Sequence, residues 1–410
     1  MYKTKYVVSI LMLLIVTHLL QAQSGTNSPF TRFGYGDINS TTYSASRAMG
    51  GIGIGYRAKS TINPVNPASY SNVDTLTFMF DLGGSLTYST LRSGDEKNSG
   101  FNGSFDYLTL MFPITRWMGM SLGMNPYSSV GYNFGSTDTL SLDNQKYISQ
   151  EMYNGSGGLS QVYLGASAKF LKHYSVGINA YYLFGNITHY RERNLLNDAG
   201  ASNTFQRDNL HISDFRFRYG FQYFNIFDNK HALTLGAIYE NKSSLNGNFE
   251  YMMYGGHIQE THESKQGFDF PSKYGVGAYY TYNKKISVGV DFDFQNWSNA
   301  KYYGQTGTLN DVSRFSLGVE YLPDPFSKKF LGRVRYRAGT TASNSYVIED
   351  NMNYAVTAGV GIPFRRNASV LNIGFEYGES GDKATIRENY FKVTLSTTFV
   401  ERWFYKNVIR

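Results

Sequence analysis

The side chains in this sequence that are best placed to do chemistry are arginines and carboxylates at alternate positions of extended segments. Arg216 and Arg218 alternate with aromatic residues, and Asp291 and Asp293 alternate with apolar ones. Such alternation places the polar side chains of a strand on one face. Because arginine binds carboxylates through two parallel hydrogen bonds, this face can bind an anionic ligand or form an internal ion-pair network. The charged residues predicted to share the face are Arg216, Arg218, Asp291, Asp293, Arg314, Glu320, Arg333, Arg335, Arg337 and Glu376.

Motifs for catalysis or for metal and nucleotide binding are weak or missing in the sequence. Residues 53–60 come near a phosphate-binding loop, but Ala58 stands where the motif needs its second glycine. His257 and His262 are five residues apart in a polar segment, which favours a solvated loop over a zinc site. The chain has 0 Cys and 7 His, and no catalytic triad pattern is visible. We therefore expect a protein that is not an enzyme and needs no cofactor or metal.

The composition indicates a β-rich chain. Of the 410 residues, 16% are aromatic and 17% are charged, and 42 are glycine. These values exclude a collagen, a disordered tail and a disulfide scaffold. The mean hydropathy of −0.35 excludes a bundle of transmembrane helices. The formal net charge of +7 is modest and favours contact with anionic lipid headgroups over nucleic acid.

Residues 1–22 predict an export signal. Lys3 and Lys5 precede an apolar stretch that ends at Leu20, and Ala22 supplies a small residue. The stretch is shorter than the roughly 20 residues that span a bilayer, so we expect cleavage after Ala22 rather than a retained anchor. The mature protein would then be either soluble after export or an outer-membrane barrel.

Alternation between residues 74 and 400 favours the barrel. In Ile286–Gln295 the apolar residues lie on one face and the polar residues and glycine on the other. The alternating segments are longer than most globular strands, and short turns alternate with long polar loops, as in outer-membrane barrels. The long loops are expected at 93–100, 135–145, 191–204, 255–266 and 299–308.

The predicted fold class is an all-β, antiparallel transmembrane β-barrel of about 14 strands over residues 74–400, with a periplasmic tail at 401–410. Hydrocarbon cannot hydrogen-bond an open edge, so the sheet must close on itself. The aromatic residues expected to form interfacial girdles are Trp117, Tyr132, Trp297, Tyr302, Tyr303, Tyr321 and Trp403.

Residues 23–73 do not alternate and predict a compact hatch in the barrel lumen. Pro64 and Pro67 prevent ladder hydrogen bonds in this segment. The hatch can be movable or static, and its many turns favour a static one. The residues expected to hold it are Asn63, Pro64, Asn66, Pro67, Ala68 and Ser69.

Three short motifs resemble the long-chain fatty-acid transporter (FadL) family of outer-membrane proteins. They are Arg47-Ala48-Met49-Gly50-Gly51, Asn66-Pro67-Ala68 and Gly155-Ser156-Gly157-Gly158-Leu159. The resemblance implies 14 strands, an N-terminal hatch and a strand distortion that opens a lateral exit, here expected at Gly155, Gly157 and Gly158. A simple bend of the wall is the alternative, because glycine bends occur in barrels of every function.

The resemblance further implies passage of hydrophobic, fatty-acid-like small molecules across the outer membrane, through loop capture, hatch displacement and lateral release. The sequence is also similar to the PorV-like branch of the family, which serves protein export. The alternative function is therefore a structural, secretion-associated or assembly subunit that binds protein partners in the membrane. The polar face argues against a wholly greasy tunnel, and we interpret its charges as an ion-pair network that also anchors the hatch. The expected partners are outer-membrane lipid with either a hydrophobic ligand or a protein, and no nucleic acid.

Overall fold

The computed structural model describes residues 25–403 except 40, 143–144, 198–201, 229, 256–257, 265–266, 350, 365–368 and 382–385. The predicted signal at 1–22 and most of the predicted tail at 401–410 lie outside the described residues.

Fourteen antiparallel strands close into one barrel, as the alternation predicts. The last strand pairs with the first, for instance at Val393 and Leu86, so the sheet has no break between its two ends. The barrel strands are β2 (Thr77–Ser93), β3 (Glu96–Pro113), β4 (Met118–Leu142), β5 (Gln145–Phe170), β6 (Tyr174–Leu195), β7 (Thr204–Ile226), β8 (His231–Glu240), β13 (Lys273–Tyr282), β14 (Ile286–Gln295), β15 (Val312–Tyr321), β16 (Arg335–Asn344), β17 (Met352–Phe364), β18 (Ser369–Gly381) and β19 (Arg387–Arg402). The last strand thus continues two residues past the predicted end of the barrel.

The two faces of the wall differ in the way that a membrane barrel requires. On β14 the side chains of Val288 and Phe292 are exposed on the outside, whereas those of Asp291 and Asp293 are buried inside. Acyl chains solvate the outer apolar side chains, while the inner polar ones find partners within the lumen.

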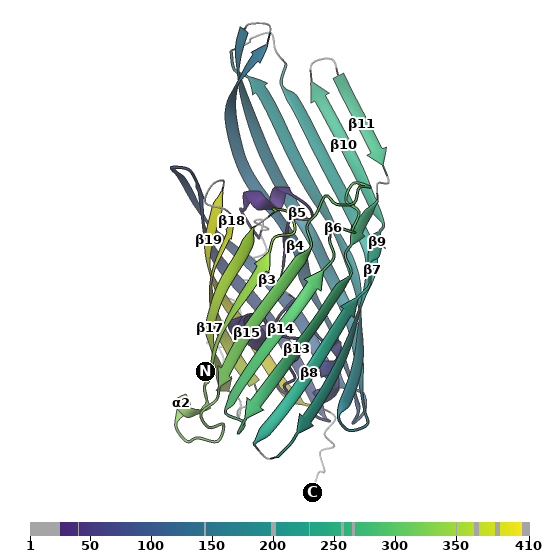
Figure 1. Ribbon diagram of the computed structural model, residues 1–410, viewed down its shortest axis with the longest axis vertical. Helices are drawn as coiled ribbons and strands as arrows, with labels where there is room; N and C mark the ends of the chain where they lie inside the picture. The colour runs from purple at the N-terminus through teal and green to yellow at the C-terminus, as the bar shows by residue number, and fades with distance from the viewer. Residues whose placement is uncertain are drawn as a thin grey trace, which may run out of the picture.

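The barrel is much taller on one side than on the other (Figure 1). Strands β4 to β7 contain 25, 26, 22 and 23 residues, whereas β8 and β13 to β16 contain 10 each. β10 (Gly247–Gly255) pairs with the upper part of β7, and β11 (Ile258–Ser264) pairs with β10. We call this extension the projecting wall; it comprises residues 130–142, 145–157, 187–195 and 204–210 together with β10 and β11.

Three of the predicted long loops are instead ends of hairpins in which the strands continue. Residues 93–100, 135–145 and 255–266 lie mostly within strands of the described chain. Both faces of a strand are wetted once it leaves the bilayer, so its sequence loses the apolar alternation that marks a strand.

The N-terminal residues pack inside the barrel, where Figure 1 shows them in purple. They form η1 (Pro29–Arg32), β1 (Asp37–Ile38), η2 (Ser44–Met49) and η3 (Pro67–Asn72). η2 contacts β15 to β19, and η3 contacts β4 to β7. No helix in the described ranges is long and apolar enough to cross a membrane.

A second apolar core lies inside the barrel at the base of the projecting wall. Tyr35 from the N-terminal segment is fully buried there against Phe270 and Trp297. The short strands β9 (Ser243–Leu245) and β12 (Phe268–Phe270) pair with each other and contribute to it. The N-terminal segment therefore contacts the barrel at two places: η2 and η3 pack against the barrel strands, and Tyr35 packs into the core at the base of the projecting wall.

The predicted aromatic girdle is only partly present. Trp117 and Trp403, near the short turns, are 51% and 48% exposed. Trp297 and Tyr132 are 1% and 4% exposed and belong to the inner core, against which Tyr302 and Tyr303 also pack. A position near a strand end does not tell which face the ring occupies, so spacing alone misplaced these residues.

Candidate functional site

A carboxylate of the barrel wall clamps the glycine-rich part of the hatch. Asp291 on β14 accepts hydrogen bonds from the backbone N–H groups of Gly53 and Ile54 at 2.5 and 2.7 Å, and from Gly55 at 3.4 Å. Successive backbone N–H groups form a concave nest that suits an anion. Three donors satisfy this buried carboxylate, which holds residues 53–55 against the wall.

Asn63, from the predicted hatch set, ties two turns of the hatch together. Its side-chain amide donates to the carbonyl oxygens of Gly53 and Tyr56 at 2.6 and 2.9 Å. Its own carbonyl accepts a hydrogen bond from the hydroxyl of Ser69 at 3.1 Å. Buried polar groups need such partners, so the turns cannot separate without a cost.

Asn66 joins the hatch to the wall. Its side-chain oxygen accepts from the N–H of Ala68 at 3.1 Å and caps η3, whose first residue is Pro67. Its side-chain amide donates to the carbonyl oxygens of Ile54 at 2.8 Å and of Phe221 on β7 at 3.1 Å. One side chain therefore bonds both halves of the hatch and the barrel.

The wall is shaped to the hatch at Gly236 on β8. A methyl group at Gly236 would lie 2.0 Å from the carbonyl oxygen of Ile54, and one at Gly119 on β4 would lie 2.1 Å from that of Tyr70. Only glycine allows backbones to approach this closely. Hatch and wall therefore fit as one packed unit.

Charged residues of the lumen form separate ion-paired groups. Arg216 and Arg218 on β7 share Glu240 on β8, with nitrogen–oxygen distances of 3.2 and 2.7 Å. Arg218 also donates to the carbonyl oxygen of Pro64 at 3.1 Å, so this group anchors the hatch. In a second group, Asp293 binds Lys273 at 2.9 Å.

Asp293 also binds Arg314 at 2.8 Å. In a third group, Glu320 on β15 binds Arg335 and Arg337 on β16 at 3.0 and 2.7 Å. Arg337 also donates to Asn372 on β18 at 2.7 Å. Glu240, Asp293 and Glu320 are therefore each paired with two cations, which favours an ion-pair network over a site for an anionic ligand.

Two charged residues of the predicted set lie outside these groups. Glu376 on β18 accepts a hydrogen bond from the hydroxyl of Tyr390 at 2.8 Å and stands opposite Lys392 on β19. Arg333 ends α2 (Phe330–Arg333) in a turn on the short-turn side, so its predicted place on the inner face is wrong. Strand β16 begins only at Arg335, and the rule that alternate residues share a face does not apply outside a strand.

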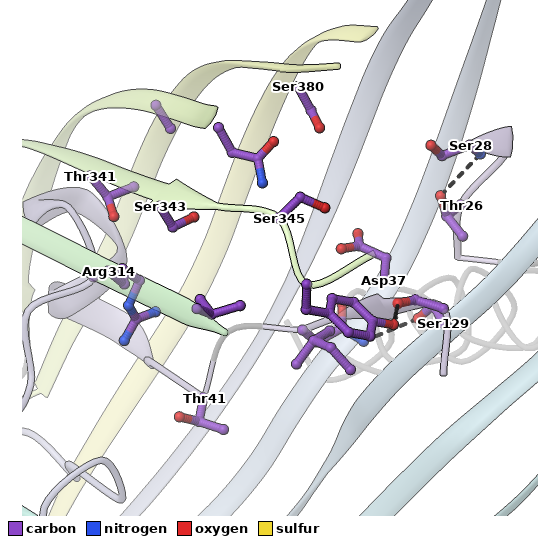
Figure 2. A pocket seen from close by; sticks show the side chains of 18 of the residues that line it. Thr26, Ser28, Asp37, Thr41, Ser129, Arg314, Thr341, Ser343, Ser345 and Ser380 are labelled. Atoms are coloured by element: carbon purple, nitrogen blue, oxygen red, sulfur yellow. Dashed lines mark hydrogen bonds between the residues drawn. The ribbon is translucent and has the colours of Figure 1, made fainter. Parts of the chain in front are cut away.

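One cavity inside the barrel is lined largely by hydroxyl and charged side chains. It has a volume of about 430 Å³ and lies between residues 25–51 and the inner faces of β2, β3 and β16 to β18. Figure 2 shows Thr341, Ser343 and Arg314 pointing into it, with Ser28 and Asp37 on the opposite side. Hydroxyl and charged side chains favour water over an acyl chain.

The wall is not hydrogen-bonded over its full height between β3 and β4. Their ladder runs only from Leu108 opposite Met124 to Pro113 opposite Gly119. Above it, β3 pairs with β2 alone, while β4 pairs along its whole length with β5. The register of β4 shifts next to Pro126, and such a bulge bends a strand away from its neighbour.

The N-terminal segment fills the lower part of this gap. β1 pairs with Ser128 and Ser129 of β4, and the N–H of Asn39 donates to the carbonyl oxygen of Tyr127 at 2.9 Å. The hydroxyl of Thr31 lies 3.2 Å from the N–H and 3.3 Å from the carbonyl oxygen of Gly131. We call residues 25–39 the N-terminal strap.

The lateral opening predicted at Gly155, Gly157 and Gly158 is not at these residues. Gly157 pairs with Val130 on one side and Ile187 on the other, so the ladder continues through the glycines. The gap lies one strand earlier, beside β4. Gly157 and Gly158 have φ of +106° and +142°, and a methyl group at Gly158 would lie 2.3 Å from the carbonyl oxygen of Ser128. They let β5 follow the bulge of β4.

A protein-family model described as BamG matches residues 1–409. The chain belongs to the BamG family.

Solved structures similar to this BamG protein share its fold at low sequence identity. A FadL homologue of Pseudomonas aeruginosa has 14% identity and a TM-score of 0.61, covering 88% of this chain and 99% of that one. The Pseudomonas putida toluene transporter TodX has 14% identity and a TM-score of 0.59, covering 90% and 100%. The Ralstonia pickettii toluene transporter TbuX has 16% identity and a TM-score of 0.57, covering 89% and 99%. No curated protein matches the chain. The predicted 14-stranded barrel with a FadL-like fold is confirmed.

The projecting wall of this BamG protein carries its own charged group, far from the lumen. Arg191 and Arg193 on β6 bind Glu151 on β5, with hydrogen bonds of 2.8 and 2.6 Å. Burial opposes ionisation of Glu151, but hydrogen bonds from Tyr153 and both arginines lower its pKa to about 2. Nearby, burial and the charge of Arg32 lower the pKa of His189 to about 4, so that imidazole is neutral near pH 7.

Sequence reasoning missed two charged residues that bind polar groups inside the barrel, Glu240 and Arg57. Glu240, the partner of Arg216 and Arg218, ends a short strand whose alternation gave no sign of a charge partner. Arg57 is held by uncharged groups: it donates to the carbonyl oxygen of Ala68 and to Gln222, both at 2.9 Å. Arg57 stands two residues after Gly55, the last glycine of the glycine-rich turn, and that position was the only available signal.

Proposed function

We propose that this BamG protein is a structural or assembly subunit of the outer membrane that binds other proteins with its projecting wall. A single observation carries the proposal: a tall, multi-stranded wall rises from a barrel whose lumen contains an N-terminal segment that is hydrogen-bonded to the barrel wall. A conduit needs a path through the lumen, whereas a scaffold needs a rigid base and an exposed surface.

The rigid base is supported by the contacts of the hatch. Asp291 and Arg218 of the wall bond backbone groups of the hatch, and the side chain of Asn66 in the hatch donates to a backbone carbonyl of β7. Displacing the hatch would break all of these contacts together, and each buried group left without a partner costs about 1–3 kcal/mol. A static hatch is therefore favoured over a movable one.

The exposed surface is supported by the length of β4 to β7. A strand of 25 residues spans about 80 Å at roughly 3.3 Å per residue, far more than a tilted crossing of the hydrocarbon core needs. A barrel that only crosses the membrane gains nothing from this extra length, whereas a protein-binding surface does.

The test is co-purification of the full-length protein from native membranes. Residues 137–150, the end of the β4–β5 hairpin, are replaced by an Asn-Gly turn, which joins Ser136 to its partner Glu151. We expect a stoichiometric protein partner to be lost, while a matched shortening of the β2–β3 hairpin retains it. A partner that co-purifies with both shortened variants, or with neither of them, would contradict the proposal.

The second candidate is passage of hydrophobic, fatty-acid-like small molecules, as first inferred from the FadL resemblance. It is supported by the gap between β3 and β4 and by a fold shared with proteins described as toluene transporters. In this mechanism the loops capture the ligand, the hatch shifts and the ligand leaves laterally beside β4. The polar lining of the cavity opposes it.

Uptake of a labelled fatty acid by cells tests this candidate. Cross-linking the strap to β4 through a disulfide between Asp37→Cys and Ser129→Cys closes the gap, because these residues are paired. Uptake that falls on oxidation and recovers on reduction would favour passage. Uptake equal to that of cells lacking the protein in both states would exclude it.

A further inference from the structure

The upper edge of β4 is a long strand edge that lacks a strand partner. Above Gly131, β4 continues to Leu142, with β5 on one side and, among the residues described, no strand on the other. Unpaired backbone groups on an edge are a template for another strand. The edge faces the gap between β4 and β3.

Part of the same edge already accepts a strand. β1 adds to β4 at Ser128 and Ser129 in antiparallel register, and Thr31 occupies both backbone groups of Gly131. The backbone N–H and C=O groups of Gly131 point into the gap. Because alternate residues of a strand direct these groups to the same side, we expect the same direction at four further residues, Asn133, Gly135, Thr137 and Thr139. The free edge is therefore continuous with one that is already used for strand addition.

The two outer edges of the projecting wall differ in how they are protected. β11 ends the wall on the far side, is 7 residues long and carries Glu260, His262 and Glu263. Short length and charges are usual guards against unwanted pairing. Residues 130–139 of β4 contain one charge, Asp138, and neither lysine nor proline.

An apolar shelf lies beside the unguarded edge. By alternation from the buried Tyr132, the ring of Phe134 turns inward, where it packs 5.3 Å from that of Tyr153. The guanidinium of Arg32 covers Tyr153 at 3.9 Å from the ring centre. A strand placed beside Phe134 would set an inward-facing apolar side chain against this shelf.

We infer that residues 133–139 of β4 bind one extended segment of a partner protein, which adds as a strand directly above β1. This inference rests on the proposed function, because it names the surface through which the projecting wall binds its partner. Main-chain hydrogen bonds supply the affinity, and an apolar side chain against Phe134 supplies selectivity.

The test places a photo-crosslinking amino acid at Asn133 in the full-length protein in its native membrane, with a matched probe at Gln259 on β11. We expect a discrete adduct with another protein from Asn133 and none from Gln259. Thr137→Pro removes one edge-facing N–H and should reduce the adduct about fivefold to tenfold, the effect of one hydrogen bond. Thr137→Ala keeps that N–H and should leave the adduct unchanged.

Folding of both variants is checked by heat-modifiable gel mobility, and proline at an edge position is compatible with a folded sheet. Equal adducts from Thr137→Pro and Thr137→Ala would overturn strand addition. An adduct with the mass of two copies of this chain would overturn a partner protein as the occupant. If Asn133 gives no adduct while the hairpin-dependent partner still co-purifies, the strand inference fails and the proposed function stands. If no partner co-purifies at all, both fail.

Discussion

The lower barrel, which is the part of the barrel below the projecting wall, shares strands β4 to β7 with that wall, yet the two regions solve opposite problems. In the lower barrel, acyl chains surround the strands, so every backbone group needs a partner within the protein and the sheet closes. In the wall, water can satisfy an open edge, so the sheet ends at β4 and β11 without closing. Closure is therefore imposed by the surroundings of a strand and not by the strand itself.

The inner contacts of the two regions differ in the same way. Below, side chains such as Asp291 and Glu240 are buried and each binds several partners of the hatch or wall. Above, the group around Glu151 is partly exposed, and the edge of β4 is free over residues 133–139. We therefore expect substitutions in the lower barrel to lower the stability of the protein strongly, and substitutions in the projecting wall to change the binding of a partner protein.

The largest expected effect comes from Glu240→Ala in the lower barrel. The change leaves the buried cations of Arg216 and Arg218 without their carboxylate, and breaking a buried pair in this way costs about 3–5 kcal/mol. Reversible chemical unfolding in detergent micelles measures the loss. The control is Asp74→Ala, which removes the exposed pair with Lys59 and should not change stability measurably. Equal stability of Glu240→Ala and wild type would show that the lower barrel does not depend on this group.

Asp291→Ala should loosen the hatch itself. It leaves the N–H groups of Gly53 and Ile54 without an acceptor, at a cost of about 1–3 kcal/mol each. Hydrogen exchange at these amides should then rise by about tenfold or more. The control is Asp138→Ala in the projecting wall, which should leave the exchange of the hatch unchanged. Unchanged exchange in Asp291→Ala would mean that the clamp does not hold the hatch.

Gly236→Ala tests how tightly the wall and the hatch fit. The new methyl group would meet the carbonyl oxygen of Ile54, and such overpacking typically costs about 1–3 kcal/mol. Gly103→Ala on β3 is the matched control, since its methyl group would only touch Leu86 at an ordinary 3.4 Å. A difference in unfolding midpoint between the two variants supports the fit. Equal midpoints would mean that the hatch moves aside freely.

The lower barrel was largely predictable from the sequence, because lipid outside and a polar lumen inside require apolar and polar residues to alternate along each strand. Acyl chains on one side and a polar lumen on the other force a period of two, as in Ile286–Gln295, and parity then placed Asp291 and Asp293 inside. The turns at Asn63 and Asn66 were visible because proline and asparagine stop a ladder. The ion pairs of the lumen were not predictable. Glu240 and Arg218, for example, are brought together by the register of β7 and β8, which neither strand's sequence reveals.

The projecting wall was not predictable for the converse reason. Residues 135–145 are polar on both faces, so no period distinguishes a strand from a loop. The gap beside β4 depends on where pairing with β3 stops, which is a property of two strands and not of either sequence. Gly157 and Gly158 lie close to the gap, because they accommodate the bulge of β4, but they are on β5 and the gap is on the other side of β4.

The smallest expected effect is a pH dependence confined to the wall. The pKa of Glu151 is lowered to about 2 from an ordinary 4.5, so its contribution is complete above pH 4.5 and is lost as the pH falls towards 2. Between pH 7 and pH 3 we therefore expect a modest rise in hydrogen exchange near Arg191 and Arg193, after correction for the intrinsic rates. Glu151→Gln should show the faster exchange already at pH 7 and no further change with pH. Exchange near Arg191 and Arg193 that is as slow at pH 3 as at pH 7 would mean that the ionised Glu151 does not hold these two arginines.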